Sequence, residues 1–178
     1  MRMKKTGARE AILKERAVTI GRAPDRAEAA GDRFEVVEFL LMYERFAVES
    51  KFVQEICPLK EISLLPCVPP FVVGVMNVRG RIVPVVDIRR FFDFPMKKLT
   101  DMNRVIVLAS GDTEFGILAD VIHGMRRIYV ERLQTSLPTL TGIREEYLKG
   151  VTGDGVVVLD GVKLLSDGRI FVNDQVES

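Results

Sequence analysis

From Phe34 onward, the apolar residues of this chain occur in short runs rich in Val and Ile that end at Gly, Pro, Asp or Asn. Such runs, bounded by turn-forming residues, are typical of β-strands. Helical patterns in this part are few and short, at Ile88–Phe92, Arg144–Tyr147 and Val162–Leu165. The pattern therefore predicts an all-β body with a few short helices. The expected strands are 35–42, 45–48, 52–56, 72–76, 81–86, 104–109, 114–118, 121–128 and 155–159.

The order of these strands occurs twice. A shift of 69 positions places the apolar residues of 36–56 on those of 105–125, and a shift of 73 places 83–92 on 156–165. Aliphatic strands also match one another by chance, so the repeat is a hypothesis.

If the repeat is real, it predicts two small antiparallel barrels of about five strands each, since closing a sheet removes its exposed edges. The barrels would occupy roughly 34–100 and 101–168 of a domain over 34–178, and they could exchange strands.

The first 33 residues differ from this body in charge. They hold nine Lys or Arg against five Asp or Glu, a net of +4, whereas residues 34–178 carry a net of −3. Apolar residues at helical spacing predict one amphipathic helix across Ala8–Arg22, and Ala27–Asp32 resembles a linker. Two interpretations stay open for this basic helical extension: a loosely attached segment, or a docking helix for a partner or an acidic surface.

Charge and hydropathy exclude several classes of protein. The whole chain has a net charge of +1, which gives no electrostatic case for binding nucleic acid. The longest uncharged stretch, Ile62–Val78, contains three prolines and is unsuited to a membrane-spanning helix. Met1–Glu10 lacks the apolar segment of a secretory signal, so a cytoplasmic protein without direct membrane insertion is expected.

The sequence suggests no catalytic chemistry. The single histidine, His123, lies in an apolar strand pattern and is predicted to be a structural or surface residue. Cys57 and Cys67 have apolar neighbours and are expected to be buried, reduced thiols. Asp87 and Asp160 end strands before short helices, where a carboxylate caps backbone N–H groups. We therefore expect no enzyme activity, no catalytic residue, no metal and no cofactor.

One hairpin stands out from the other strands. Two apolar strands flank the turn of residues 77–80 (NVRG), in which Gly80 can adopt positive φ and Arg79 projects at the tip. An Arg on a rigid hairpin is a directional donor for carboxylates or carbonyls of a partner, whereas the pattern alone slightly favours an ordinary hairpin with a solvated Arg.

This segment resembles the CheW-like adaptor domains of bacterial chemotaxis. Residues 74–80 (GVMNVRG) and 83–89 (VPVVDIR) fit the family pattern throughout, and the resemblance continues in family order across roughly 34–165. It implies two packed, five-stranded SH3-like β-barrels. It also implies a scaffold in signal transduction that couples the cytoplasmic tips of chemoreceptors to the regulatory domain of the histidine kinase CheA.

By the same resemblance, a receptor-binding groove lies between the barrels, and kinase-binding surfaces lie on barrel loops that the sequence does not place. The residues implied at the receptor groove are Val53, Glu55, Gly74, Asn77, Arg79 and Ile82.

Two alternatives stay open. The first is a CheW-like adaptor of a chemosensory system for surface motility or development. The second is a small ligand-binding or enzymatic double barrel, with His123 or the loop Gly150–Gly155, which otherwise resembles a turn, at its site. The chain is not expected to carry a receiver domain of the kind fused to such modules in the related CheV proteins, since little sequence follows the last predicted strand.

Overall fold

The computed structural model describes residues 31–91, 94–95, 98–100, 102–135 and 145–170. The chain divides into two units, Met1–Gly31 and Asp32–Ser178. The predicted helix across Ala8–Arg22 lies outside the described residues. The second unit carries all of the elements given below.

The described part of the chain is mostly β-structure, as predicted. Its helices are α2 (Ile88–Phe91) and α3 (Gly161–Ser166), with 3₁₀ turns η1 (Ser50–Phe52), η2 (Val130–Arg132) and η3 (Glu145–Tyr147). The strands are β1 (Arg33–Leu41), β2 (Glu44–Glu49), β3 (Val53–Pro58), β4 (Val72–Val78), β5 (Arg81–Val86), β6 (Arg104–Ser110), β7 (Thr113–Ala119), β8 (Val121–Tyr129), β9 (Leu133–Gln134), β10 (Leu148–Thr152) and β11 (Val157–Leu159).

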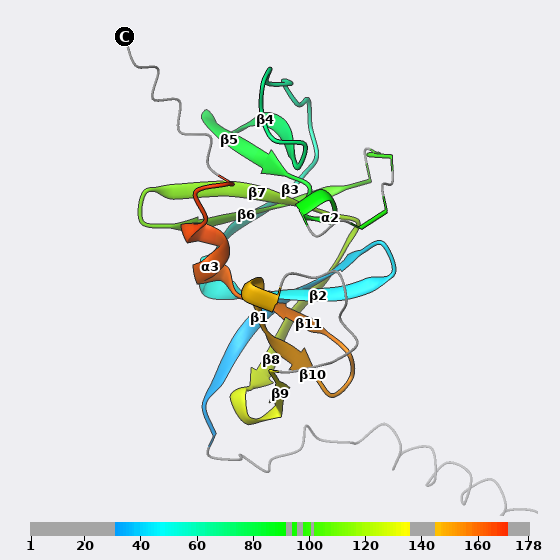
Figure 1. The fold of residues 1–178 in the computed structure, drawn as a ribbon, viewed down its shortest axis with the longest axis vertical. Helices are drawn as coiled ribbons and strands as arrows, with labels where there is room; N and C mark the ends of the chain where they lie inside the picture. The colour runs from blue at the N-terminus through cyan, green and yellow to red at the C-terminus, as the bar shows by residue number, and fades with distance from the viewer. Residues whose placement is uncertain (1–30, 92–93, 96–97, 101, 136–144, 171–178) are drawn as a thin grey trace, which may run out of the picture. The chain divides into compact units, whose positions relative to one another are not determined.

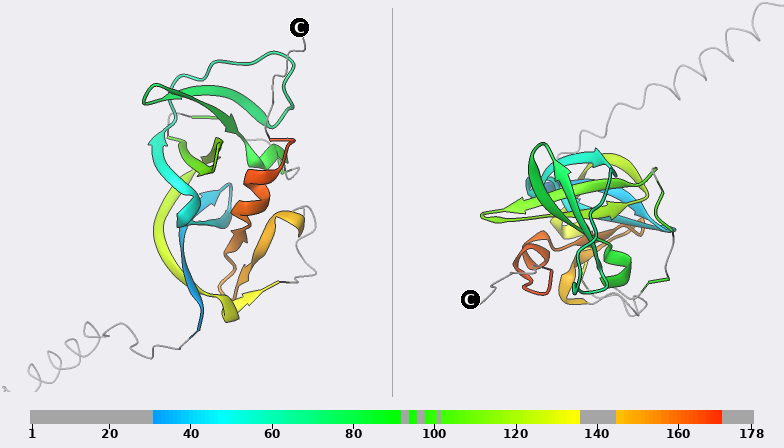
Figure 2. Two further views of the ribbon diagram at one scale, coloured as in Figure 1. Left: turned by 90° about the vertical axis from the view of Figure 1, so that its left-hand side faces the viewer. Right: turned by 90° about the horizontal axis from the view of Figure 1, so that it is seen from above.

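These strands form two packed sheets (Figures 1 and 2). The five-stranded sheet has the order β3-β6-β7-β5-β4, and the six-stranded sheet has the order β8-β1-β2-β11-β10-β9. The all-β prediction of two packed units is therefore confirmed, although one of them has six strands rather than the predicted five, because the short β9 pairs with β10. Among the described residues, no ladder joins the first strand of either sheet to its last.

The two sheets contain the same arrangement of ladders. In the five-stranded sheet β5 runs parallel to β7, with Val85 opposite Gly116, and in the six-stranded sheet β11 runs parallel to β2, with Val158 opposite Ala47. These pairs are related by the shifts of 73 and 69 positions that the sequence suggested. Each sheet combines strands from both sides of residue 100, so the two halves of the body exchange strands.

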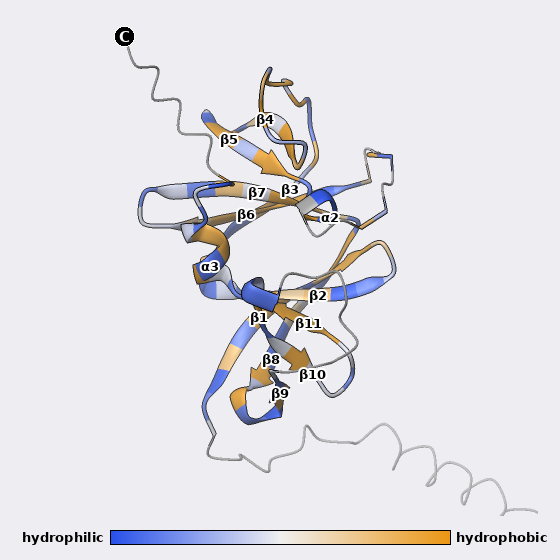
Figure 3. Cartoon of the chain, in the orientation of Figure 1, coloured by the Kyte–Doolittle hydropathy of each residue, from blue (hydrophilic) through white to orange (hydrophobic). Residues whose placement is uncertain are grey.

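The largest apolar cluster takes side chains from strands of both sheets. Phe39, Phe46 and Phe115 are fully buried in it, together with Leu164 of α3. Figure 3 shows β6 and β11 largely in the apolar colour. Burial of apolar side chains, aliphatic and aromatic, is the main favourable contribution to the stability of such a core.

Three local expectations need correction. Cys67 is exposed rather than buried, because it lies in the proline-rich loop before β4, and Cys57 is only partly buried. The helix predicted at Arg144–Tyr147 is the 3₁₀ turn η3. The first three residues of Gly150–Gly155 belong to β10, and the turn is confined to the residues after Thr152, where Gly155 N donates to Thr152 O at 2.8 Å.

Candidate functional site

The predicted receptor residues lie around the two edge strands of the five-stranded sheet, β3 and β4. A groove of about 250 Å³ separates these strands. Glu55 comes from β3, while Asn77 and Arg79 come from the hairpin that β4 forms with β5. The lining residues are Glu55, Ile56, Cys57, Pro58, Lys60, Met76, Asn77, Val78 and Arg79.

The turn of this hairpin has the geometry that the sequence predicted. Arg79 and Gly80 both have positive φ, 53° and 86°, and Val78 pairs with Arg81 across a two-residue loop. Positive φ at both central residues matches the type I′ turn that joins twisted antiparallel strands. Asn77 Oδ1 accepts a hydrogen bond from Gly80 N at 2.8 Å, which fixes the turn from within. Arg79 is thereby held at the tip.

Arg79 reaches across the groove to the opposite edge strand. Its Nε lies 3.0 Å from Glu55 Oε2, so the two charged residues predicted at the rim form an ion pair. The Arg79 side chain is 82% exposed, whereas that of Glu55 is only 16% exposed. The rim therefore exposes the guanidinium of Arg79 to solvent and keeps the carboxylate of Glu55 largely covered.

The other predicted residues take different positions. Gly74 is buried, and a Cβ atom at this position would lie 2.4 Å from the backbone oxygen of Ser63. Val53 is partly buried against the main core. Ile82 is 65% exposed and lines a second hollow together with Asn77 and Val75. The structure thus brings Glu55, Asn77 and Arg79 together on one groove, while Ile82 lies on the neighbouring hollow.

Three polar residues of this rim were not predicted from the sequence. Arg81 NH2 donates to Glu55 Oε1 at 2.7 Å, and its NH1 donates to Gln54 Oε1 at 2.9 Å and also to Glu114 Oε1. The only signal in the sequence was the position of Arg81 directly after the turn. Its contact with β7 depends on the sheet order, which the local sequence does not reveal.

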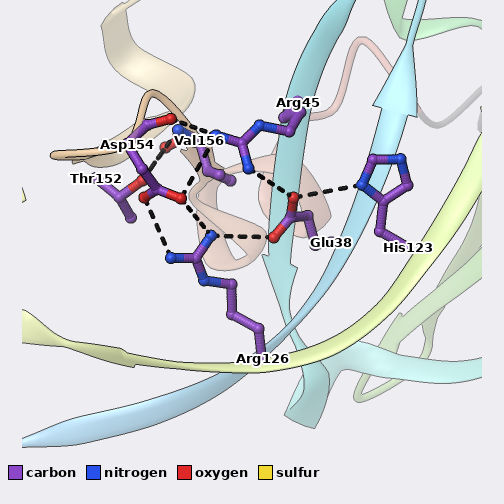
Figure 4. A network of polar contacts seen from close by, with 7 residues as sticks. All are labelled: Glu38, Arg45, His123, Arg126, Thr152, Asp154 and Val156. Atoms are coloured by element: carbon purple, nitrogen blue, oxygen red, sulfur yellow. Dashed lines mark hydrogen bonds and ion pairs between the residues drawn. The ribbon is translucent and has the colours of Figure 1, made fainter. Parts of the chain in front are cut away.

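A second polar cluster lies on the six-stranded sheet (Figure 4). Arg126 of β8 donates to Asp154 at 2.9 and 3.1 Å and to Glu38 of β1 at 3.1 Å. The hydrogen bonds from Arg126 hold the pKa of the Asp154 carboxyl well below its usual range. Arg45 also contacts both carboxylates. His123 Nδ1 lies 3.5 Å from Glu38 Oε1 with its side chain 39% exposed, in agreement with the prediction of a structural or surface residue.

The capping predictions had different outcomes. Asp160 is the N-cap of α3 and accepts a hydrogen bond from Lys163 N at 3.1 Å. Asp87 accepts one from Arg89 N at 3.1 Å, but it also forms a buried ion pair with the Arg89 guanidinium.

Within the described ranges, no group of three or more His, Cys, Asp or Glu side chains could hold a metal ion, and no helix has the length and apolar character needed to cross a membrane.

Comparison with known proteins identifies the family. The CheW-like domain matches residues 35–169, which is most of the chain. The chain belongs to the CheW-like family. This confirms the family that the hairpin motif predicted, and with it the chemosensory adaptor role that the resemblance implied.

Individual relatives agree with this assignment. Chemotaxis protein CheW of Treponema pallidum is 29% identical over 146 residues, covering 78% of this chain and 86% of the relative. Protein FrzA of Myxococcus xanthus is 33% identical over 155 residues, covering 83% and 96%. The crystal structure of the scaffolding protein TtCheW from Thermoanaerobacter tengcongensis has the same fold, with a TM-score of 0.67 at 22% identity, covering 84% of this chain and 96% of that one.

Proposed function

We propose that this CheW-like chain couples the cytoplasmic tips of chemoreceptors to the regulatory domain of a CheA-type histidine kinase, and that it catalyses no reaction itself. In this role it works in the cytoplasm, at arrays of membrane-anchored receptors, without a cofactor. The observation that carries the proposal is the groove between β3 and β4, with the Arg79–Glu55 ion pair across it, in a domain of this family.

The chemistry of the rim suits a helical partner. Ile56 and Ile82 are 40% and 65% exposed near the charged pair, so apolar anchors and charges lie within one small surface. A helix face can bury its apolar residues against such anchors, while the charges set its register. An interface confined to so small a surface is weak alone, and many copies in an array would make the binding effective.

A second candidate is an adaptor in a chemosensory system for surface motility or development. The relatives include proteins that are not named for chemotaxis: FrzA, and PilI of Pseudomonas aeruginosa, which is 33% identical over 87 residues and covers 49% of this chain. The domain would be the same in both systems, and only the receptor and the kinase would differ.

The test is co-sedimentation of the full-length protein with receptor cytoplasmic fragments and a CheA-type kinase of the same organism, with kinase autophosphorylation as the readout. We expect wild type to stimulate the kinase and Arg79→Asp to lose receptor binding while it still unfolds cooperatively. Arg127→Asp is the matched control, because Arg127 is also an exposed arginine in an ion pair, with Glu35 on β1, outside the groove. Absence of any complex with the wild-type protein would refute the proposed function.

A further inference from the structure

Glu55 is shared by two arginines of one hairpin. Its Oε2 lies 3.0 Å from Arg79 Nε, and its Oε1 lies 2.7 Å from Arg81 NH2. The two arginines differ in their surroundings, because the Arg79 side chain is 82% exposed and the Arg81 side chain is 37% exposed. Glu55 thus has one exposed partner and one that is largely covered.

Arg81 is anchored by more than Glu55. Its NH1 also donates to Gln54 Oε1 at 2.9 Å and to Glu114 Oε1 on β7. For Arg79, in contrast, Glu55 is the single ion-pair partner found in the described part of the chain. Arg81 is therefore fixed by side chains of two strands, while Arg79 is attached at one point.

This difference decides which arginine can leave Glu55. An ion pair with a well-exposed member contributes little to stability, so Arg79 can turn away at small cost. Leaving a mostly covered carboxylate without its only cation costs much free energy. Because Arg81 remains on Glu55, that penalty does not arise when Arg79 departs.

We infer that Arg81 is a positioning residue. It stays paired with the Glu55 carboxylate when Arg79 leaves, and so frees the Arg79 guanidinium to bind a carboxylate on the partner's helix. The guanidinium fork matches an Asp or Glu side chain in two parallel hydrogen bonds. After the exchange, Arg81 lies between Glu55 and Glu114, and Lys60, which lines the same groove, supplies a further positive charge. The inference rests on the proposed function, in which a receptor tip occupies this rim.

The first test measures the affinity of the full-length protein for the receptor cytoplasmic fragment by titration calorimetry. We expect Arg81→Met to weaken binding about five-fold, because Arg79 then becomes the only cation on Glu55. Arg81→Lys should restore most of the affinity. Glu114→Gln is the matched control: it removes one bond to Arg81 but leaves the Arg81–Glu55 pair intact, so binding should not change.

A double-mutant cycle separates this role from a merely structural one. In a Glu55→Gln background, Arg79 is no longer held, and Arg81→Met should have no further effect on affinity. An equal loss from Arg81→Met in both backgrounds, or an equal loss in Glu114→Gln, would overturn the inference.

The second test does not need the receptor. NMR of the arginine Nε–H groups follows their exchange with water. We expect the Arg79 signal to exchange several-fold more slowly in Arg81→Met than in wild type, since Arg79 would then be the only cation on Glu55 and would be held there more firmly. Unchanged exchange would overturn the inference. A receptor fragment that fails to bind wild type would instead refute the proposed function, so the two failures are distinguishable.

Discussion

Asp87 and Arg89 form an ion pair that is almost completely removed from solvent, although both belong to the hairpin motif that carries the family resemblance. Arg89 donates from Nε to Asp87 Oδ1 at 2.8 Å and from NH2 to Oδ2 at 2.9 Å. The Arg89 side chain is 0% exposed, and that of Asp87 is 2% exposed. The hydrogen bonds that Arg89 donates to the Asp87 carboxylate raise the pKa of Arg89 above its usual value, which favours the charged guanidinium in the core.

The first prediction is that replacing only one member of this pair strongly lowers the free energy of unfolding. Asp87→Ala leaves a buried guanidinium without its bidentate partner and should lower the free energy of unfolding by about 3–5 kcal/mol. Arg89 NH1 lies 3.8 Å from Asp120 Oδ1 and makes no hydrogen bond within the described residues, so this atom cannot compensate through an existing bond. Urea unfolding followed by circular dichroism measures the loss.

The double variant Asp87→Ala/Arg89→Met is the control for this prediction. Removing both charges should cost less than Asp87→Ala alone, since an uncompensated ion is worse than an apolar replacement. Additive losses would contradict the ion-pair explanation.

The second prediction concerns the cap of α3. Asp160→Ala removes the hydrogen bond to Lys163 N and should cost about 1 kcal/mol, because the helix loses the acceptor for one of its free N–H groups. Asp160→Asn should retain most of the stability, since asparagine also caps well. The melting temperatures of the two variants, compared with that of wild type, test this prediction. Equal decreases in Asp160→Ala and Asp160→Asn would show that the charge of Asp160 matters more than its capping hydrogen bond.

Much of this fold was predictable from local patterns. The bounds of β5, Arg81–Val86, were predicted to the residue, because the turn before it and the Asp87 after it mark both ends. By contrast, β9 and β10 were missed. β9 has two residues and exists only through its pairing with β10, while β10 contains Lys149 and Gly150 and lacks a continuous apolar run.

The candidate site was predictable in part, for a similar reason. The turn around Arg79 is a local feature, and its glycine and asparagine were visible in the sequence. The pairing of Arg79 with Glu55, and of Arg81 with Glu114, depends on how edge strands and neighbouring strands meet in the sheet. No local pattern contains that information. An arginine at position 89 would also be assigned to the surface by composition alone, yet it is fully buried.

The third prediction is a loss of stability in acid that depends on Glu49. Burial raises the pKa of this carboxyl, but the hydrogen bonds from Lys149 and Lys51 outweigh burial, and the pKa lies below its ordinary value of 4.5. A folded-state pKa below the unfolded one stabilises the protein above the unfolded pKa, and that contribution is lost as pH falls through the folded pKa. The free energy of unfolding should therefore decrease below about pH 5.

The measurement is urea unfolding at a series of pH values between neutral and acidic. Glu49→Gln should lower the stability at neutral pH by about 1–3 kcal/mol and flatten its decrease in acid. Glu35→Gln is the control, because Glu35 forms an ion pair with Arg127 in which both side chains are about half exposed, and this variant should keep the wild-type slope. An unchanged slope in Glu49→Gln would contradict the prediction.

The fourth prediction is that Gly74 acts on the proposed receptor surface through the loop before β4. A Cβ atom here would lie 2.4 Å from Ser63 O and 2.6 Å from Ile62 Cγ2, and the φ of 151° is rare for other residues. Gly74→Ala must therefore displace the loop, whose Ser63 exchanges two backbone hydrogen bonds of 2.9 Å with Val75. We expect a loss of about 1–3 kcal/mol in stability, with weaker receptor binding, because Val75 lines the hollow beside Ile82.

Gly153→Ala is the matched control for Gly74→Ala. A Cβ atom at Gly153 meets nothing within 4 Å, so the same chemical change should leave both stability and receptor binding at the wild-type level. Calorimetric melting temperatures and receptor affinities of the two variants test this together. If Gly74→Ala weakened binding without any loss of stability, Gly74 would contact the partner directly, because the steric explanation requires the loop to move and the Ser63–Val75 bonds to break.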